Sequence, residues 1–225
     1  MERMDRRKLL GLAALLPFVG LVACATGPGA YTVEEGVRRL LSLSTQRAFD
    51  RLLAPNGFYD SQVARIAVPQ GFGGNGTVLG ALLQSGPVRR EIGIALNQVA
   101  QDAAERATPV VLDAVRRMTL RDAVAVLRGG PTAATTLLQR EAGGAVLDAM
   151  LPEVSRGLRS DIIRTVSAAF ATKSGIDYAE LGETVAGQAS DGLFRAIGRE
   201  EAAIRADPRA TRDPVLIALL GVGAR

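Results

Sequence analysis

The sequence contains no histidine and no tryptophan, and Cys24 is its only cysteine. The lack of histidine removes imidazole as a general base, as a metal ligand and as a pH switch near neutrality. Serine–histidine and cysteine–histidine catalysis, and zinc sites built on these ligands, are therefore excluded, and we expect neither a cofactor nor a metal. A single cysteine cannot form an intramolecular disulfide, so the stability of the fold must come from packing.

Aromatic residues are also scarce, with three tyrosines and six phenylalanines among 225 residues. Platforms that stack sugars or single-stranded bases are therefore poorly supplied. The whole chain carries a net charge of +4, but the first 23 residues hold four of its 27 basic and two of its 23 acidic residues. The remaining 23 basic and 21 acidic residues leave a net charge of only +2, which does not favour a nucleic acid partner.

The N-terminus has the three-part organisation of a secretory signal. Four basic residues among the first eight precede an uncharged run of 14 residues, from Leu9 to Val22, that ends in small side chains. A helix that spans a membrane needs about 20 apolar residues, so we expect residues 1–23 to be a signal peptide rather than a permanent span. The adjacent Arg6 and Arg7 leave open whether export uses the general or the twin-arginine route.

The end of this segment, Leu21-Val22-Ala23-Cys24, resembles the lipobox of bacterial lipoproteins, in which the signal is cut before the cysteine and the new terminus is acylated. Cleavage by the ordinary signal peptidase and an uncleaved anchor remain the alternatives, because Ala23-Cys24-Ala25 also satisfies a small-x-small rule. The lipobox predicts a periplasmic protein anchored through Cys24, which we expect on the outer membrane. Residues 24–31, rich in glycine, should form a flexible tether.

Helical signals fill the rest of the chain. Thr32-Val33-Glu34-Glu35 has the spacing of a capping box, and apolar residues at helical spacing follow, which predicts a helix over 32–53. Residues 63–68 alternate but have no partner strand, so we expect an ordered loop there. Further helices are expected at 77–84, from Pro87 to about Ala107, from Thr108-Pro109 to Met118, from Thr119 to Gly129-Gly130, from Pro131 to Gly143-Gly144, and from Ala145 onward with breaks near Pro152, Lys173, Pro208 and Pro214. The predicted fold is all-α, a single compact domain of eight or nine helices over residues 32–225.

Two patterns suggest chemistry but have simpler explanations. Residues 71–76 match the letters of a dinucleotide fingerprint, G-x-G-x-x-G, but that motif needs a preceding strand, a parallel partner strand and a well-placed acid. A flexible surface loop is the better interpretation. Asp102 with Arg106, and Glu201 with Arg205, are i,i+4 pairs typical of exposed helix faces, and we expect them at the surface.

Several motifs resemble the bacterial family called domain of unknown function 4197. They are LNQVAQ (96–101), MTLRDA (118–123) and LRGGPTAAT (127–135), with NGF (56–58), IAVP (66–69) and DGLF (191–194) at the expected order and spacing, and later Glu201, Ile204-Arg205 and Pro208. The resemblance covers residues 37 to 220, nearly the whole mature chain. It implies an exported helical envelope protein of Gram-negative bacteria and brings no known activity. The family pattern has an acid where this chain has Gln101 and a tyrosine where it has Leu137, so functions of those side chains cannot operate here.

Four polar residues in these motifs, Asn97, Gln101, Asp122 and Thr135, are candidates for a buried polar cluster. Buried polar groups must find partners, so such a cluster would either specify the fold or bind a ligand. Thr119 and Asp122 have the spacing of a helix start, and Gly129 that of a left-handed helix stop, which favours the first use.

Three functions remain open from the sequence. The first is a non-catalytic, lipid-anchored module that binds an envelope partner or an apolar ligand between its helices. The second is a hydrolase or transferase that uses carboxylates and arginine, with Asp122 and another acid in one cleft. The third is a structural or assembly factor, which should expose a large apolar patch.

The predicted anchor can be tested by growth with a radiolabelled fatty acid. The wild-type protein should be labelled and the Cys24→Ala variant should not, because the variant lacks the acylated side chain. Equal labelling of both proteins would refute the attachment at Cys24.

Overall fold

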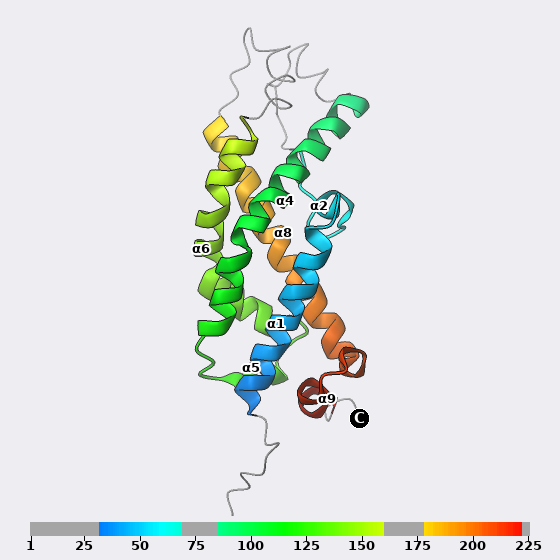
Figure 1. Ribbon diagram of the computed structural model, residues 1–225, viewed down its shortest axis with the longest axis vertical. Coiled ribbons are helices and arrows are strands. Elements are labelled where there is room, and N and C mark those ends of the chain that lie inside the picture. Colours follow the sequence, from blue (N-terminus) through cyan, green and yellow to red (C-terminus); the bar gives the residue numbers. More distant parts are fainter. Residues whose placement is uncertain (1–31, 69–84, 160–177, 222–225) are drawn as a thin grey trace, which may run out of the picture. The chain divides into compact units, whose positions relative to one another are not determined.

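The computed structural model describes residues 32–68, 85–159 and 178–221, all within one compact unit, Tyr31–Arg225 (Figure 1). These residues form helices and no strand, which confirms the all-α prediction. The helices are α1 (Val33–Leu52), α2 (Gly57–Asp60), α4 (Gly86–Arg117), α5 (Ala123–Arg128), α6 (Ala133–Gly157), α8 (Tyr178–Ala206) and α9 (Pro214–Leu220), with a 3-10 helix, η1, at Pro208–Thr211. Within these ranges no helix is both long and apolar enough to span a membrane.

Several predictions made from the sequence concern residues outside these ranges. The signal peptide, Cys24, the tether, the glycine-rich 71–76 and the helix expected at 77–84 all lie outside the described ranges.

Helix α1 begins where the capping box predicts. The Glu35 amide donates to Thr32 Oγ1 at 3.1 Å, which satisfies one of the free N–H groups of the first turn. Beyond Leu52 the chain turns sharply through Asn56, which adopts a left-handed conformation with φ 60°. A Cβ on Gly57 would lie 2.3 Å from the Arg51 carbonyl oxygen, so only glycine lets the chain pass this close to the end of α1.

Helix α4 runs without a break from Gly86 to Arg117, so the two helices predicted on either side of Pro109 are one. A proline inside a helix lacks an N–H and leaves the carbonyl four residues earlier without its partner. That carbonyl belongs to Glu105, and both Glu105 and Pro109 are exposed, so water can solvate it. Ala107 and Val111 on the opposite face are fully buried, and their packing outweighs the local break.

Helix α6 continues in the same way through Gly143-Gly144, where an end was predicted, and through Pro152. Two glycines cost a helix about 1 kcal/mol each relative to alanine. Val146, Met150 and Val154 are nevertheless fully buried against the neighbouring helices, which stabilises the continuous form. The described ranges contain seven α-helices, whereas eight or nine were expected for the whole domain. The continuity of α4 and α6 accounts for part of this difference.

The helix that follows α4 differs in its start and its end from the prediction. Asp122, not Thr119, is the N-cap residue of α5. Gly129 ends the helix with φ −68° and not in the left-handed region. Glycine is needed there for another reason, because a Cβ would lie 2.6 Å from the Cβ of Ala133.

The long helices α1, α4, α6 and α8 pack against one another and bury a shared core (Figure 1). The largest buried side chains come from all four helices and the segments between them, namely Leu40, Leu41, Leu52, Phe58, Ile66, Leu96, Leu138, Met150, Leu158, Leu193, Phe194 and Ile197. Small residues allow close approach, since a Cβ on Gly157 of α6 would lie 2.6 Å from Val99 of α4.

Helix α9, near the C-terminus, packs against the N-terminal part of α1. The Leu219 side chain lies where a Cβ on Gly36 would be, at 2.2 Å, and Arg39 of α1 binds Asp213 at 3.2 Å. Burial alone would raise the pKa of Asp213, but the hydrogen bonds it accepts from Leu216, Arg39 and Val215 together hold that pKa below its ordinary value. The N-cap of α9 therefore contributes its full stabilisation above the ordinary carboxyl pKa and loses it as the pH falls through the lowered value.

Residues 61–68 form an ordered loop, which includes the loop predicted over residues 63–68, and they pack against α8. A Cβ on Gly192 of α8 would lie 2.9 Å from the carbonyl oxygen of Ala64 and 3.0 Å from its Cα. Ala64 is fully buried, and Ile66 is nearly so. The loop backbone thus occupies the space that a side chain at position 192 would need.

We expect Gly192→Ala to destabilise the protein by about 1–3 kcal/mol, because the added methyl group must displace backbone and not a flexible side chain. The matched control is Gly187→Ala on the same helix, where a Cβ meets nothing within 4 Å. That variant should gain about 0.5–1 kcal/mol from helix propensity. Urea titrations followed by circular dichroism measure both, and equal effects would contradict the close packing of the loop.

Candidate functional site

The four polar residues proposed as a cluster form four separate sets of hydrogen bonds. Asn97 and Gln101 lie one turn apart on α4, Asp122 caps α5, and Thr135 lies in the first turn of α6. The side-chain hydrogen bonds described for them join none of the four to another. Each bonds to a different segment.

The Asn97 side chain bonds to the backbone of the loop of residues 61–68. Its Oδ1 accepts from the Ile66 amide at 2.8 Å, and its Nδ2 donates to the Ile66 carbonyl at 3.1 Å and to the Gly93 carbonyl at 2.7 Å. Both sides of the amide are used, and the residue is 2% exposed. Asn97 therefore recognises the chain's own main chain in the way a neighbouring strand would.

Gln101 and Asp122 satisfy helix ends. Gln101 Nε2 donates to the Leu53 carbonyl at 3.1 Å, just beyond the end of α1. Asp122 Oδ1 accepts from the Ala125 amide at 3.1 Å and so caps α5. Each contact gives a hydrogen-bond partner to a backbone group that has no partner within its own helix.

Thr135 belongs to a hydrogen-bond network around the fully buried Glu201. Glu201 Oε1 accepts from the Ala134 amide at 3.0 Å, and Oε2 accepts from the Thr135 amide at 2.7 Å and from the Thr135 hydroxyl at 2.6 Å. The N-cap residue of α6, Thr132, makes no capping hydrogen bond with its own side chain. A carboxylate from α8 thus caps α6, where the positive end of the helix dipole favours it.

Arg205 completes this network from the next turn of α8. Its Nε donates to Glu201 Oε1 at 2.8 Å, and its Nη1 and Nη2 donate to the Leu127 and Val126 carbonyls at 2.7 and 3.0 Å. The prediction that Glu201 and Arg205 form an exposed pair was therefore wrong, because Glu201 is 0% exposed. Helical phase could have indicated this, since Glu201 lies four residues after the buried Ile197 and three before the buried Ile204.

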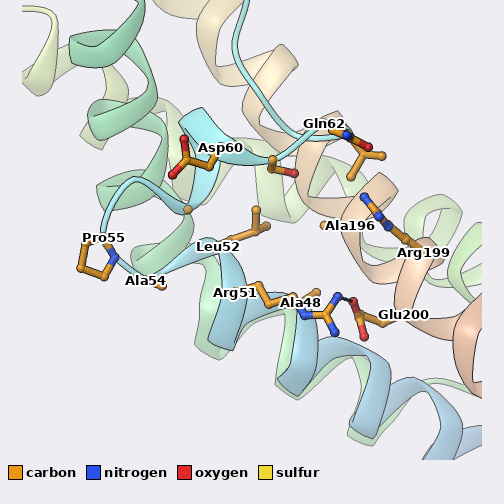
Figure 2. Close-up of a pocket in the computed structure, with 13 residues that line it drawn as sticks. Ala48, Arg51, Leu52, Ala54, Pro55, Asp60, Gln62, Ala196, Arg199 and Glu200 are labelled. Atoms are coloured by element: carbon orange, nitrogen blue, oxygen red, sulfur yellow. Dashed lines mark ion pairs between the residues drawn. The ribbon is translucent and has the colours of Figure 1, made fainter.

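A cavity of about 460 Å³ opens beside the C-terminal end of α1 (Figure 2). It is lined by Ala48, Arg51 and Leu52 of α1, Ala54 and Pro55 of the turn, Gly57 and Asp60 of α2, Ser61, Gln62 and Val63 of the loop, and Ala196, Arg199 and Glu200 of α8. This volume lies within the range of about 300–1,000 Å³ usual for small-molecule sites. We call it the α1–α8 cavity.

An ion pair between α1 and α8 borders this cavity. Arg51 Nη1 binds Glu200 Oε1 (Figure 2), and the side chains differ sharply in burial, with 68% of Arg51 exposed against 4% of Glu200. A buried carboxylate needs a counter-ion, and Arg51 is the one that the structure describes. No motif in the sequence singled out Glu200, although it follows the buried Ala196 and Ile197 at helical spacing.

Two further charges line the same cavity and are exposed. Asp60 and Arg199 make neither an ion pair nor a side-chain hydrogen bond with any described residue. In Figure 2, Leu52 lies between Asp60 and the Arg51–Glu200 pair, and Arg199 projects from α8. The cavity therefore presents balanced charges around an apolar centre.

A second, more open cavity of about 370 Å³ is lined by both Glu34 and Asp122, together with Arg121. Both carboxylates are exposed, and Asp122 is the cap of α5. Catalytic carboxylates are usually tuned by burial or by a close charged partner, and neither condition is described at this pair. Among the described residues no three potential ligands group to hold a metal ion.

Fold and site together define an all-helical domain in which buried polar side chains bind the chain's own backbone and charged side chains line the α1–α8 cavity at the surface. Residues 28–221 match the model of the family described as "Protein of unknown function (DUF4197)", and the chain belongs to this family. No curated protein matches the chain, and no solved structure does either. The family membership predicted from the motifs is thus confirmed, and it assigns no activity.

The buried network predicts a large cost for Glu201→Gln. The amide would place donors against donors and leave the Arg205 charge without its counter-ion, so we expect a loss of about 3–5 kcal/mol in the free energy of unfolding. The matched control is Glu35→Gln, in an i,i+4 pair with Arg39 whose side chains are 41% and 43% exposed.

The control should change stability little, because solvent screens an exposed pair. The comparison can be made by urea titration at neutral pH. A Glu201→Gln protein as stable as the Glu35→Gln protein would show that the network does not hold the helices together.

Proposed function

We propose that this protein is a non-catalytic binding module, exported and held at a bacterial membrane through acylated Cys24, that docks an envelope partner in the α1–α8 cavity. The observation that carries the proposal is the cavity itself, about 460 Å³ in volume and bordered by the Arg51–Glu200 pair. Ligand sites combine apolar walls with a few placed polar groups, and this cavity has both.

The hydrogen bonds made by these polar side chains support a binding role over a catalytic one. Asn97, Gln101, Asp122 and Glu201 all satisfy backbone groups of the chain itself. In the described part of the chain, Thr45 Oγ1 is the one buried side-chain polar atom without a hydrogen-bond partner. Groups engaged in this way are costly to redirect toward a substrate.

The cavity favours a partner with polar groups over the apolar ligand that the sequence also left open. Arg51, Asp60, Arg199 and Glu200 line it, and an apolar ligand would desolvate charges without pairing them. The interior between the four long helices is filled by side chains such as Leu96, Leu138 and Ile197, which are fully buried.

The other two functions receive less support. For a carboxylate-dependent hydrolase, Asp122 and Glu34 share the second cavity but are both exposed. For an assembly factor, Val124 is the one large apolar side chain among the described residues that is classed as exposed, at 46%, and a docking face of that kind needs a contiguous apolar patch.

Site-specific photo-crosslinking in the producing bacterium tests the proposal. A photoreactive residue at Ala54, on the cavity lining, should give a defined adduct in the membrane fraction. The same residue at Glu141, an exposed position on α6, should not. Docking in the cavity also predicts that Arg199→Glu reduces the Ala54 adduct by about tenfold, since reversing one charge alters complementarity.

Adducts of equal yield at Ala54 and Glu141, or an Ala54 adduct that Arg199→Glu leaves unchanged, would place binding elsewhere. Arg199 is exposed and has no ion-pair partner among the described residues, so the variant should fold normally. Circular dichroism of the purified variant provides that control.

A further inference from the structure

We infer that the α1–α8 cavity binds a small zwitterion, a molecule that carries an ammonium group and a carboxylate within the length of a dipeptide. This inference rests on the proposed function, because it names the chemistry of the group that the cavity takes. Three observations carry it: the charge balance of the lining, the pairing of Arg51 with the buried Glu200, and the apolar side chains that lie among the charges.

The lining carries two positive and two negative side chains, Arg51 and Arg199 against Asp60 and Glu200. Arg51 and Glu200 already pair with each other, which leaves one free cation and one free anion. A ligand with a single charge would match one of these and leave the other desolvated and unpaired. A zwitterion matches both.

The carboxylate of the ligand belongs beside Arg51 and Arg199. A guanidinium has five N–H donors in a planar fork, and the ion pair with Glu200 uses the Nη1 end of Arg51. No other hydrogen bond of Arg51 is described. Glu200 is 3% exposed and fixed by packing, so it holds the Arg51 fork in place before a ligand arrives, and planar forks bind carboxylates well.

The ammonium group belongs on the opposite side, beside Asp60. Asp60 carries a full negative charge and makes no ion pair with any described residue, so it suits a primary ammonium group.

Apolar side chains lie between the two ends, beside the polar Ser61 and Gln62. Leu52 lies between Asp60 and the Arg51–Glu200 pair in Figure 2, and Ala48, Val63 and Ala196 also line the cavity. An occupant should therefore be short, with small apolar groups between its charges. A free dipeptide with small side chains has this form.

The test uses dialanine and its three blocked forms as probes, titrated into the full-length protein with binding followed by NMR chemical shifts. Dialanine should bind, whereas N-acetyl-dialanine, dialanine amide and the doubly blocked form should each bind at least about tenfold more weakly, a factor that corresponds to about 1.4 kcal/mol. Binding of all four with equal affinity, or of none, would overturn the inference.

Two variants assign the ends. Asp60→Asn should abolish the preference for a free ammonium group and keep that for a free carboxylate. Arg199→Gln should reduce the preference for a free carboxylate, to which Arg51 also contributes, and keep that for a free ammonium group. Both side chains are exposed, so both variants should fold. The matched controls Arg140→Gln and Glu141→Gln, exposed neighbours on α6, should keep both preferences, and a loss of preference in these controls would also count against the site.

The two proposals fail separately. If the Ala54 crosslink captures a partner in a charge-dependent way but dialanine does not bind, the cavity is a docking site and the zwitterion is wrong. If dialanine binds with both preferences but no adduct forms at Ala54, the site takes a free small molecule and the docked envelope partner is wrong.

Discussion

The fold depends on a carboxylate that sits in the interior of the protein. Glu201 of α8 caps the first turn of α6, and through Arg205 it also binds the last carbonyls of α5. Three helices therefore share one charge pair, and α6 in turn makes the most extensive contacts in the core, with α4 and α8. Removing either partner would leave the other buried without a counter-ion, which is among the costliest changes that a core can suffer.

A neutral side chain, the Asn97 amide, provides a second constraint, because it too satisfies backbone groups in the interior. Asn97 uses its whole amide on the backbone of Ile66 and Gly93, and Gln188 and Arg195 of α8 contact the same loop through the Ala67 amide and the Val63 carbonyl. The loop is thus held between α4 and α8 by side chains that satisfy its main chain. These bonds specify the interior, so the charges that remain for a partner lie at the surface, around the α1–α8 cavity.

The local signals in the sequence predicted the start of α1 correctly, and they failed where proline or glycine lies inside a packed helix. A cap acts through atoms within one turn, which is why Thr32 marks the start of α1 correctly. Proline and glycine end a helix only when packing does not oppose them. At Pro109 and at Gly143-Gly144, the packing of the buried helix face opposes the break, and the helix continues. The four-residue polar cluster was predicted from motif positions. The four side chains form separate sets of hydrogen bonds in the structure, because spacing along the chain does not fix which distant segment of backbone each side chain meets.

The sequence by itself determined the helical class, the family and the absence of histidine chemistry, since composition, periodicity and motif order are properties of the chain alone. Only the tertiary structure decided that Glu201 is buried and that Arg51, Asp60, Arg199 and Glu200 line one cavity. Whether a charged pair at i,i+4 lies in water or in the core depends on the helices packed over it. Glu35–Arg39 and Glu201–Arg205 have the same residues and spacing, and the packing of α5 and α6 alone separates their environments.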